Sequence, residues 1–237
     1  MHLYIIPTPI GNLEDITLRA LRILKEVDFV LCEDTRTTQN LLKHYGIQQR
    51  CVAYHIYNEH RQLTSLIQQI QQSRSVALVS DAGTPSISDP GFLLIHEAIA
   101  QGIQIETLPG ATALIPALVN SGLPSDAFFF NGFLPHKKGK LSTLQKLAAM
   151  DCTVIFYESP HRLTKTLEMM LPIFGESRFV TVSRELTKIH EENFRGTLQE
   201  VFDHFKEKNV KGEIVVCVGK KREFTISKKY DSNNSDN

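Results

Sequence analysis

The stretch SDAGTPSISDPG, residues 80–91, follows directly on the apolar run at 76–79 and decides how the rest of the chain is interpreted. An apolar run that stops at Asp, Gly and Pro is typical of a buried strand that delivers a loop to one edge of a sheet. Because Pro fixes φ and Gly lets backbone approach a ligand closely, the stretch predicts a rigid loop with an outward-facing main chain. An ordinary connection between a strand and a helix is also compatible with these residues, since loops favour them in any case.

The same order of strand, loop and helix repeats through residues 1–120. Strands are expected at 3–6, 27–32, 76–79 and 103–108, and helices from about Asp15 and at 37–45, 63–70, 92–100 and 111–120. The last of these helices is nearly all apolar and is expected to be buried. This order predicts an α/β fold with a mostly parallel, doubly wound sheet, which binds ligands at the carboxyl ends of its strands. The loops after the strands, at 7–12, 33–36, 81–91 and 109–112, are therefore expected on one side.

The turn-rich segment SGLPSD at 121–126 marks the expected boundary between two α/β domains. These domains are expected at 1–123 and 124–220, with a disordered tail at 221–237 that is rich in charge, Ser and Asn. In the second domain, strands are expected at 127–133, 153–157, 179–183 and 213–218, and helices at 140–150, 160–171 and 197–208. The last helix should begin with a capping box formed by Thr197 and Glu200.

Composition bounds the class of protein. The 237 residues are 42% hydrophobic and 22% charged, as in an ordinary soluble globular protein, and no stretch approaches the ~20 apolar residues that span a membrane. The N-terminal segment has no basic region, and Pro7 and Pro9 interrupt its apolar run, so no signal peptide is expected and the expected location is the cytoplasm. The 26 basic and 26 acidic residues cancel, which argues against a protein that grips nucleic acid by bulk charge.

Several kinds of catalytic site are disfavoured by motifs that the sequence lacks. Its four cysteines form no CxxC pair, so buried reduced thiols are expected rather than structural zinc or disulfides. His55 and His60 have no third partner at ligand spacing, and no metal is expected. Neither a GxxxxGK[ST] phosphate loop, a GxSxG nucleophile elbow nor a GxGxxG loop is present. Glu33 and Asp34 beside Cys32 should raise the pKa of this thiol, which disfavours cysteine catalysis.

Three strands are expected to end in compact charged motifs, at 33–36, 158–162 and 184–188. Each motif mixes an acid with Arg, His or Lys. Together with the Gly/Pro loops, these motifs predict that the strand ends form the walls of a small-molecule cleft between two α/β halves. The residues alone do not identify the ligand. The motif at 33–36 is also compatible with a simple helix cap in which the arginine pairs with a neighbouring acid.

Eight motifs occur in a fixed order along the chain. They are PTPIGNLED (7–15), CEDTR (32–36), SDAGTPSISDPG (80–91), LPGATA (108–113), FNGFLP (130–135), ESPHR (158–162), SRELTK (183–188) with an acidic pair at 191–192, and GEIVV (212–216). Together they resemble the bacterial small-subunit rRNA (cytidine-2′-O)-methyltransferase I family, within the tetrapyrrole-methylase superfamily. The resemblance runs from Leu3 to about Gly219, and eight ordered motifs are far more specific than any one of them.

The resemblance implies a class III methyltransferase that has two α/β domains, binds S-adenosylmethionine in the cleft between them and forms a homodimer. In relatives, the backbone of the first loop, of the loop after the third strand and of the PG-x-S/T-A turn holds the cofactor. Thr112 stands where many relatives have Ser, and the hydroxyl is kept. The matching positions of this chain are Pro9, Ile10, Asp81, Ala82, Gly83, Thr84, Thr112 and Ala113.

The implied reaction is methylation of the ribose 2′-hydroxyl of a cytidine in the decoding centre of 16S rRNA, on the assembled small ribosomal subunit. A well-oriented pair of reactants can gain about 7–11 kcal/mol, so positioning should dominate the rate, and a proton acceptor would add about 10²–10⁴-fold. The candidate proton acceptors are Glu33, Asp34, Glu158, Glu185 and His161. The cations that would orient the acids or bind phosphates are Arg36, Arg162, Arg184 and Lys188. His161 is equally compatible with a structural role at the start of a helix.

The substrate side of the site is expected at the second half of the opening loop and on a local basic rim. An assembled subunit can be recognised by shape and by such a rim, which reconciles RNA binding with zero net charge. The expected contacts are Ser86, Asp89, Lys137, Lys138, Lys140, Lys220, Lys221 and Arg222, although a solvated lysine-rich surface would look the same. Two other functions stay open: a methylase of a tetrapyrrole precursor, disfavoured by CEDTR, ESPHR and RELTK, and a cofactor-binding assembly factor without chemistry.

Overall fold

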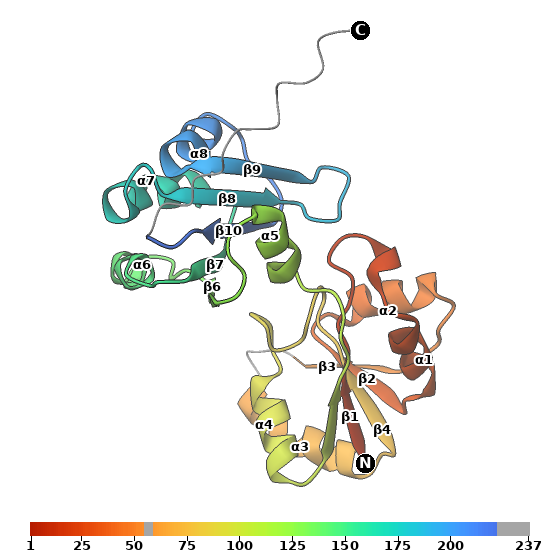
Figure 1. Ribbon diagram of the computed structural model, residues 1–237. Helices are drawn as coiled ribbons and strands as arrows, with labels where there is room; N and C mark the ends of the chain where they lie inside the picture. The colour runs from red at the N-terminus through yellow and green to blue at the C-terminus, as the bar shows by residue number, and fades with distance from the viewer. Residues whose placement is uncertain (55–58, 222–237) are drawn as a thin grey trace, which may run out of the picture. The chain divides into compact units, whose positions relative to one another are not determined.

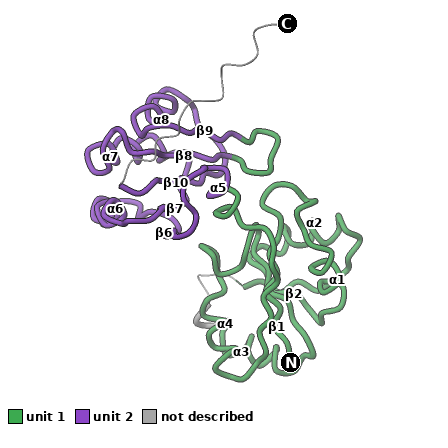
Figure 2. The backbone as a smooth tube through the Cα atoms, in the orientation of Figure 1, with its two compact units in different colours: residues 1–116, 185–191 green, residues 117–184, 192–237 purple. Residues whose placement is uncertain are grey.

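The chain forms two compact units, and each contains one five-stranded sheet. Unit 1 consists of residues 1–116 and 185–191 (Figure 2). Unit 2 consists of residues 117–184 and of the chain from Glu192 onward. Each unit has its own buried apolar core, so we describe them in turn.

The computed structural model describes residues 1–54 and 59–221. His55, one of the two histidines considered as metal ligands, lies outside this range. Arg222 and the expected disordered tail after residue 221 also lie outside the described residues.

The sheet of unit 1 is parallel throughout, with the strand order β3-β2-β4-β1-β5. Its strands are β1 (His2–Ile5), β2 (Phe29–Cys32), β3 (Cys51–Ala53), β4 (Ser75–Leu78) and β5 (Gln104–Thr107). A helix lies between each strand and the next along the chain, which confirms the expected doubly wound α/β sheet (Figure 1). The sequence does not predict β3, because three residues are too few to show a period.

Helices cover both faces of this sheet, because its central strands β2, β4 and β1 carry buried apolar residues on both sides. The helices are α1 (Leu18–Glu26), α2 (Thr35–His44), α3 (Glu59–Gln71) and α4 (Phe92–Ala100). Leu3 and Ile5 of β1 belong to a core with residues of α3 and α4, whereas Val30 and Ala77 belong to a core with residues of α1 and α2. Figure 1 shows α3 and α4 on one side of the sheet and α1 and α2 on the other. The helices therefore occupy the faces, and the loops that leave the strand ends stay at the sheet edge.

Two helices differ from the expectation drawn from their apolar pattern. Residues Leu13–Asp15 form a short 3₁₀ helix, and α1 begins at Leu18, where the Thr17 side chain accepts the N–H of Ala20. The helix α5 (Leu114–Ser121) is not buried along its whole length, because Ile115 is 44% and Val119 is 70% exposed. The apolar helix α5 therefore buries one face, at Leu114, Ala117 and Leu118, and leaves the other exposed.

The sheet of unit 2 has the order β6-β7-β10-β8-β9. Its strands are β6 (Phe128–Phe133), β7 (Thr153–Glu158), β8 (Phe179–Arg184), β9 (Glu192–Thr197) and β10 (Ile214–Val218). β6 runs parallel to β7, and the other neighbours are antiparallel. The sequence does not predict β9, because its residues ENFRGT are mostly polar.

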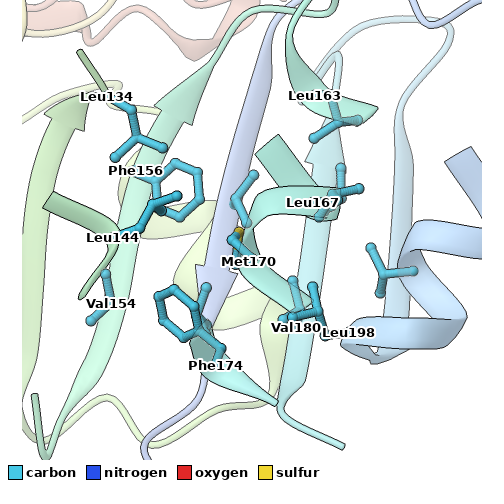
Figure 3. Close-up of a cluster of buried hydrophobic side chains, with 14 of the residues drawn as sticks. Leu134, Leu144, Val154, Phe156, Leu163, Leu167, Met170, Phe174, Val180 and Leu198 are labelled. Carbon is cyan, nitrogen blue, oxygen red and sulfur yellow. The ribbon is translucent and has the colours of Figure 1, made fainter. Parts of the chain in front are cut away.

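The core of unit 2 lies between this sheet and three helices (Figure 3). The helices are α6 (Lys140–Ala148), α7 (Leu163–Phe174) and α8 (Leu198–Phe205). Phe156 of β7 and Leu167 and Met170 of α7 have no exposed surface (Figure 3). Full burial of such a side chain is worth about 1.5–3 kcal/mol, so this cluster supplies much of the stability of the unit.

The two helix starts expected in unit 2 have different outcomes. The capping box is confirmed, because the Thr197 hydroxyl accepts the N–H of Glu200 and the Glu200 carboxylate accepts the N–H of Thr197. α7 begins at Leu163 rather than at residue 160. The Ser159 carbonyl accepts the N–H groups of both Arg162 and Leu163, which closes a turn before the helix.

Residues 185–191 fold with unit 1, although the strands on either side of them, β8 and β9, belong to unit 2 (Figure 2). The chain therefore passes from one unit to the other after Pro116, after Arg184 and after Glu191. The expected domain boundary, between 1–123 and 124–220, stays a prediction.

Candidate functional site

The loops that follow β1 and β4 are joined by hydrogen bonds. The N–H of Thr8 donates to the Gly83 carbonyl at 2.8 Å, and the N–H of Gly83 donates back at 2.9 Å. The buried Thr8 hydroxyl donates to the Ser80 carbonyl at 3.0 Å, and the Ser80 hydroxyl donates to the Gly83 carbonyl at 3.0 Å. Gly83 has a φ of +81°, which favours glycine. The two loops therefore form one hydrogen-bonded edge at the carboxyl ends of the strands.

The turn after β5 closes against the same edge. The Thr84 hydroxyl donates to the Ala111 carbonyl at 3.0 Å. A Cβ atom on Gly110 would lie 2.7 Å from the Cβ atom of Pro7, so this approach of the two backbones requires glycine. Three neighbouring loops of unit 1 thus carry the residues expected to bind the cofactor, namely Pro9, Ile10, Asp81, Ala82, Gly83, Thr84, Thr112 and Ala113.

Asp81 ties these loops to the end of β2. Its carboxylate accepts the N–H of Asp34 at 3.0 Å, while the residue as a whole is exposed. One oxygen of this carboxylate is thereby fixed in position at the carboxyl edge of the sheet. The four strand-end loops predicted to share one side of the sheet are confirmed as neighbours by these contacts.

The second half of the opening loop is a tight turn. The N–H of Ser86 donates to the Pro90 carbonyl at 3.1 Å, and Ser86 and Ser88 have φ values of +73° and +66°. Non-glycine residues are uncommon in this region of φ, so the surrounding contacts hold the loop in one shape. Ser86 and Asp89, the expected substrate contacts, are both half-buried in it.

The acidic motif after β2 forms a helix cap. Asp34 precedes α2 and accepts the N–H of Arg36 at 2.8 Å, and the Arg36 guanidinium donates to both its carboxylate oxygens at 3.1 and 2.7 Å. These hydrogen bonds from Arg36 lower the pKa of Asp34 to about 2. A carboxylate with so low a pKa is a weak proton acceptor at neutral pH. The cap thus accounts for Asp34 and Arg36 without chemistry, and Glu33 lies half-buried beside them.

Two of the four thiols, Cys32 and Cys217, are buried. Burial raises the pKa of Cys32 to about 12, and it raises the pKa of Cys217 to about 12 as well. Cys51 and Cys152 are half-buried, and all four thiols are free. The predicted rise in the pKa of Cys32 is confirmed, with burial rather than Glu33 or Asp34 as its main cause.

Glu158, at the end of β7, belongs to a buried network in unit 2. Its carboxylate accepts from the Lys140 ammonium at 2.9 Å, from the Thr166 hydroxyl at 2.6 Å and from the N–H of Ser159 at 2.7 Å. Arg162 pairs with its second oxygen at 2.8 Å. Because the Glu158 side chain is 0% exposed and engaged on every side, it fits a structural role.

Lys140 is buried and does not belong to the expected basic rim. Its side chain is 7% exposed and its ammonium is bound to Glu158 and Thr166, so it presents no charge to an RNA. Lys137 and Lys138, on the same loop, are exposed. Lys220 is half-buried, Lys221 is exposed, and Arg222 lies outside the described residues.

His161 and Arg162 occupy the turn between β7 and α7. His161 is exposed, and Arg162 is directed at Glu158. The Nε and Nη1 atoms of Arg162 are buried and have no hydrogen-bond partner among the described residues. The ESPHR motif therefore combines a fixed buried pair with one exposed imidazole.

The third charged motif is divided between the units. Arg184 ends β8 in unit 2, and its Nε atom donates to Glu192 at 3.1 Å. Glu185 and Lys188 lie in unit 1, and the Lys188 ammonium donates to the Glu185 carboxylate at 2.9 Å. These expected catalytic residues are therefore held in ion pairs inside their own units.

The part of the chain that the structure describes contains no cluster of three or more His, Cys, Asp or Glu side chains that could hold a metal ion. None of its helices is long and apolar enough to cross a membrane.

Comparison with known proteins assigns the family. The family model of the Tetrapyrrole (Corrin/Porphyrin) Methylases matches residues 2–201. A ribosomal RNA small subunit methyltransferase I of Mesorhizobium japonicum is 52% identical over 219 residues, which cover 92% of this chain and 74% of the relative. The chain belongs to the ribosomal RNA small subunit methyltransferase I family. Another family member, from Hydrogenobaculum sp., is 49% identical over 222 residues, or 93% of this chain and 96% of the relative.

A solved structure shares the fold of this methyltransferase family member. The uroporphyrin-III C-methyl transferase from Thermus thermophilus, complexed with S-adenyl homocysteine, has a TM-score of 0.66 and 20% sequence identity, covering 92% of this chain and 97% of that chain. At this identity the likeness shows the fold alone. It confirms the α/β fold of the tetrapyrrole methylases that the motifs predict.

Proposed function

We propose that this methyltransferase transfers a methyl group from S-adenosylmethionine to the ribose 2′-hydroxyl of a cytidine in the decoding centre of 16S rRNA. The observation that carries the proposal is the hydrogen-bonded edge of unit 1. There, hydrogen bonds at Thr8, Gly83 and Ala111 join the three loops expected to hold the cofactor. Family membership supplies the class of reaction and of substrate. The assembled small subunit, in the cytoplasm, is the proposed substrate.

The residues of this edge fit S-adenosylmethionine. Backbone carbonyl and amide groups beside Gly83 can approach an adenosine closely, because no side chain stands at this position. The exposed carboxylate of Asp81 can accept hydrogen bonds from ribose hydroxyls. Asp81→Ala is therefore expected to weaken cofactor binding, and unchanged affinity in titration calorimetry would remove this residue from the site.

The cofactor, when bound, supplies a sulfonium methyl group that is open to displacement. The protein then has to bring the ribose oxygen in line with that methyl carbon and to accept the hydroxyl proton. The pKa of Asp34 and the burial of Glu158 argue against these two acids as acceptors. Glu33, Glu185 and His161 remain the proposed acceptors.

The proposed substrate contacts are the half-buried Ser86 and Asp89 in unit 1 and the exposed Lys137 and Lys138 in unit 2. Lys140 is no longer among them. A local pair of lysines would grip phosphates without a net positive charge on the whole protein.

The active form is proposed to be a homodimer. Phe128, Phe129 and Phe133 lie on β6, the edge strand of the unit 2 sheet, and are 40%, 40% and 55% exposed. Exposed large apolar groups on an edge strand favour coverage by a partner chain. Sedimentation at micromolar concentration should give twice the mass of one chain, and a monomer would contradict this part of the proposal.

The test of the reaction class is transfer of labelled methyl groups. Small subunits from cells that lack this methyltransferase, and separately a tetrapyrrole precursor, are incubated with the protein and labelled S-adenosylmethionine. The proposal expects label in 16S rRNA and none in the tetrapyrrole. Label in the tetrapyrrole would favour the other methylase function, and cofactor binding without transfer to either would favour an assembly factor.

A further inference from the structure

The tip of the β8–β9 hairpin, residues 185–191, has an internal structure of its own. The Lys188 ammonium donates to the Glu185 carboxylate at 2.9 Å, and the N–H of Thr187 donates to the Glu191 carboxylate at 2.7 Å. Leu186 between them is 6% exposed. The tip is therefore a folded part of unit 1 and more than a connection between two strands.

This tip holds strained backbone and a buried polar atom. Glu185 and Thr187 have φ values of +52° and +68°, in the left-handed region that non-glycine residues rarely adopt. The Thr187 hydroxyl is buried and has no hydrogen-bond partner among the described residues. Such features persist where surrounding contacts enforce them, and they concentrate at functional sites.

The tip packs against the first loop at Gly11. A Cβ atom on Gly11 would collide with Cγ of Lys188 and would lie 2.9 Å from Oγ1 of Thr187 and 3.0 Å from Cε of Lys188. The aliphatic stem of Lys188 therefore crosses Gly11, and this approach leaves no room for a side chain there. Gly11 lies three residues after Thr8, which bonds to Gly83 in the predicted cofactor edge.

We infer that residues 185–191 are a clip that fixes loop 7–12 in its cofactor-binding shape, with Lys188 and Thr187 as positioning residues. The inference rests on the proposed function, because it assigns the first loop to the cofactor. Lys188 acts through its stem, which covers Gly11, while its ion pair with Glu185 sets the direction of that stem. Neither residue needs to touch the reacting atoms.

The first test measures the clip without the cofactor. Amide hydrogen exchange is followed in the segment 7–12 for the wild type, Lys188→Ala and the matched control Lys25→Ala, whose lysine is exposed on α1 of the same unit. The clip predicts faster exchange at Ile10, Gly11 and Asn12 in Lys188→Ala and no change in the control. Equal exchange in all three proteins overturns the inference, whatever the protein methylates.

The second test is a double-mutant cycle on S-adenosylmethionine binding by calorimetry. Gly11→Ala is expected to bind about tenfold more weakly, and Lys188→Ala about threefold more weakly. The double variant should recover part of the affinity that Gly11→Ala loses, because the clash with Cγ of Lys188 is gone and only the contact with Oγ1 of Thr187 remains. A double variant no better than Gly11→Ala contradicts the clip, since the defect would then belong to the loop itself.

Further readouts separate positioning from folding and from failure of the proposed function. A positioning residue raises the dissociation constant of the cofactor and leaves the binding stoichiometry unchanged, whereas a folding defect lowers the stoichiometry. If Gly11→Ala does not fold, unchanged cofactor affinity in Lys188→Ala overturns the inference by itself. A wild-type protein that does not bind S-adenosylmethionine refutes the proposed function, and hydrogen exchange in loop 7–12 still decides whether the clip exists.

Discussion

Lys140 Nζ lies 2.9 Å from Glu158 Oε2, and the two side chains are 7% and 0% exposed. A charge that loses its partner in such a place is left buried and uncompensated, which is costly even where the intact pair contributes little. The pair joins the start of α6 to the end of β7, so it fixes the basic loop of residues 135–139 to the ESPHR turn.

Lys140→Met is therefore expected to lower the free energy of unfolding by about 3 kcal/mol, because Arg162 alone would then compensate Glu158. The matched control, Lys137→Met, removes an exposed lysine from the same loop and should change stability by less than about 0.5 kcal/mol. Urea unfolding measures both. Equal losses in the two variants would show that the buried pair is not what holds the loop.

Glu192 should make stability depend on pH. Burial raises the pKa of Glu192, but hydrogen bonds from His204, Lys208 and Arg184 outweigh it and lower the pKa to about 2, from an ordinary value of 4.5. A carboxyl group with a depressed folded pKa stabilises the fold above its unfolded pKa, and this contribution is lost as the pH falls through the folded value.

The wild type should thus exceed Glu192→Gln in unfolding free energy at pH 7, and the gap should narrow between pH 4.5 and pH 2. Denaturant unfolding across this range is the measurement. The control is Glu207→Gln, which removes an exposed acid just after the end of α8. A gap that does not change with pH would contradict the assignment of Glu192 as the ionised centre of this network.

Gly110 should be intolerant of a side chain. In Gly110→Ala, the new Cβ atom would meet Pro7 Cβ at 2.7 Å, and the proline ring cannot rotate away. The turn would then move off the first loop, and S-adenosylmethionine should bind about tenfold more weakly. Gly219→Ala, which meets the flexible Leu123 side chain in unit 2, should leave this affinity unchanged. Equal affinities for wild type and Gly110→Ala would show that the turn does not support the cofactor.

Lys137 and Lys138 should contribute to subunit binding and not to cofactor binding. With both changed to Ala, binding to small subunits should weaken, and the slope of log affinity against log salt should fall by about 1 to 2. Lys146→Ala with Lys165→Ala removes two other exposed lysines of unit 2 and should alter neither quantity. If the two double variants bind subunits alike, the proposed rim is an ordinary solvated surface.

Most of the fold was accessible from the sequence because it depends on local signals. Apolar runs that end at Gly, Pro and Asp mark β1, β2 and β4, and the parallel order follows from alternation with helices. The close loops at Thr8, Gly83 and Ala111 follow from that topology, since the carboxyl ends of parallel strands share an edge.

Other features depend on partners distant in sequence. Burial of Lys140 has a local signal, because it stands four and seven residues before the buried Leu144 and Leu147 on α6, yet a lysine in a basic loop suggests exposure. β9 has mostly polar side chains and is a strand because its backbone pairs with β8. Residues 185–191 belong to unit 1 and contact Gly11, more than 170 residues earlier, and no local pattern predicts such a contact.

The most direct measurement of the central claim is a map of ribose methylation along 16S rRNA at single-nucleotide resolution. Small subunits from cells that lack this protein are incubated with it and S-adenosylmethionine, beside a reaction without the cofactor. The account predicts one new 2′-O-methyl group, on a cytidine of the decoding centre, and none without the cofactor. A methyl group on a base, on a ribose elsewhere, or on no nucleotide would contradict it.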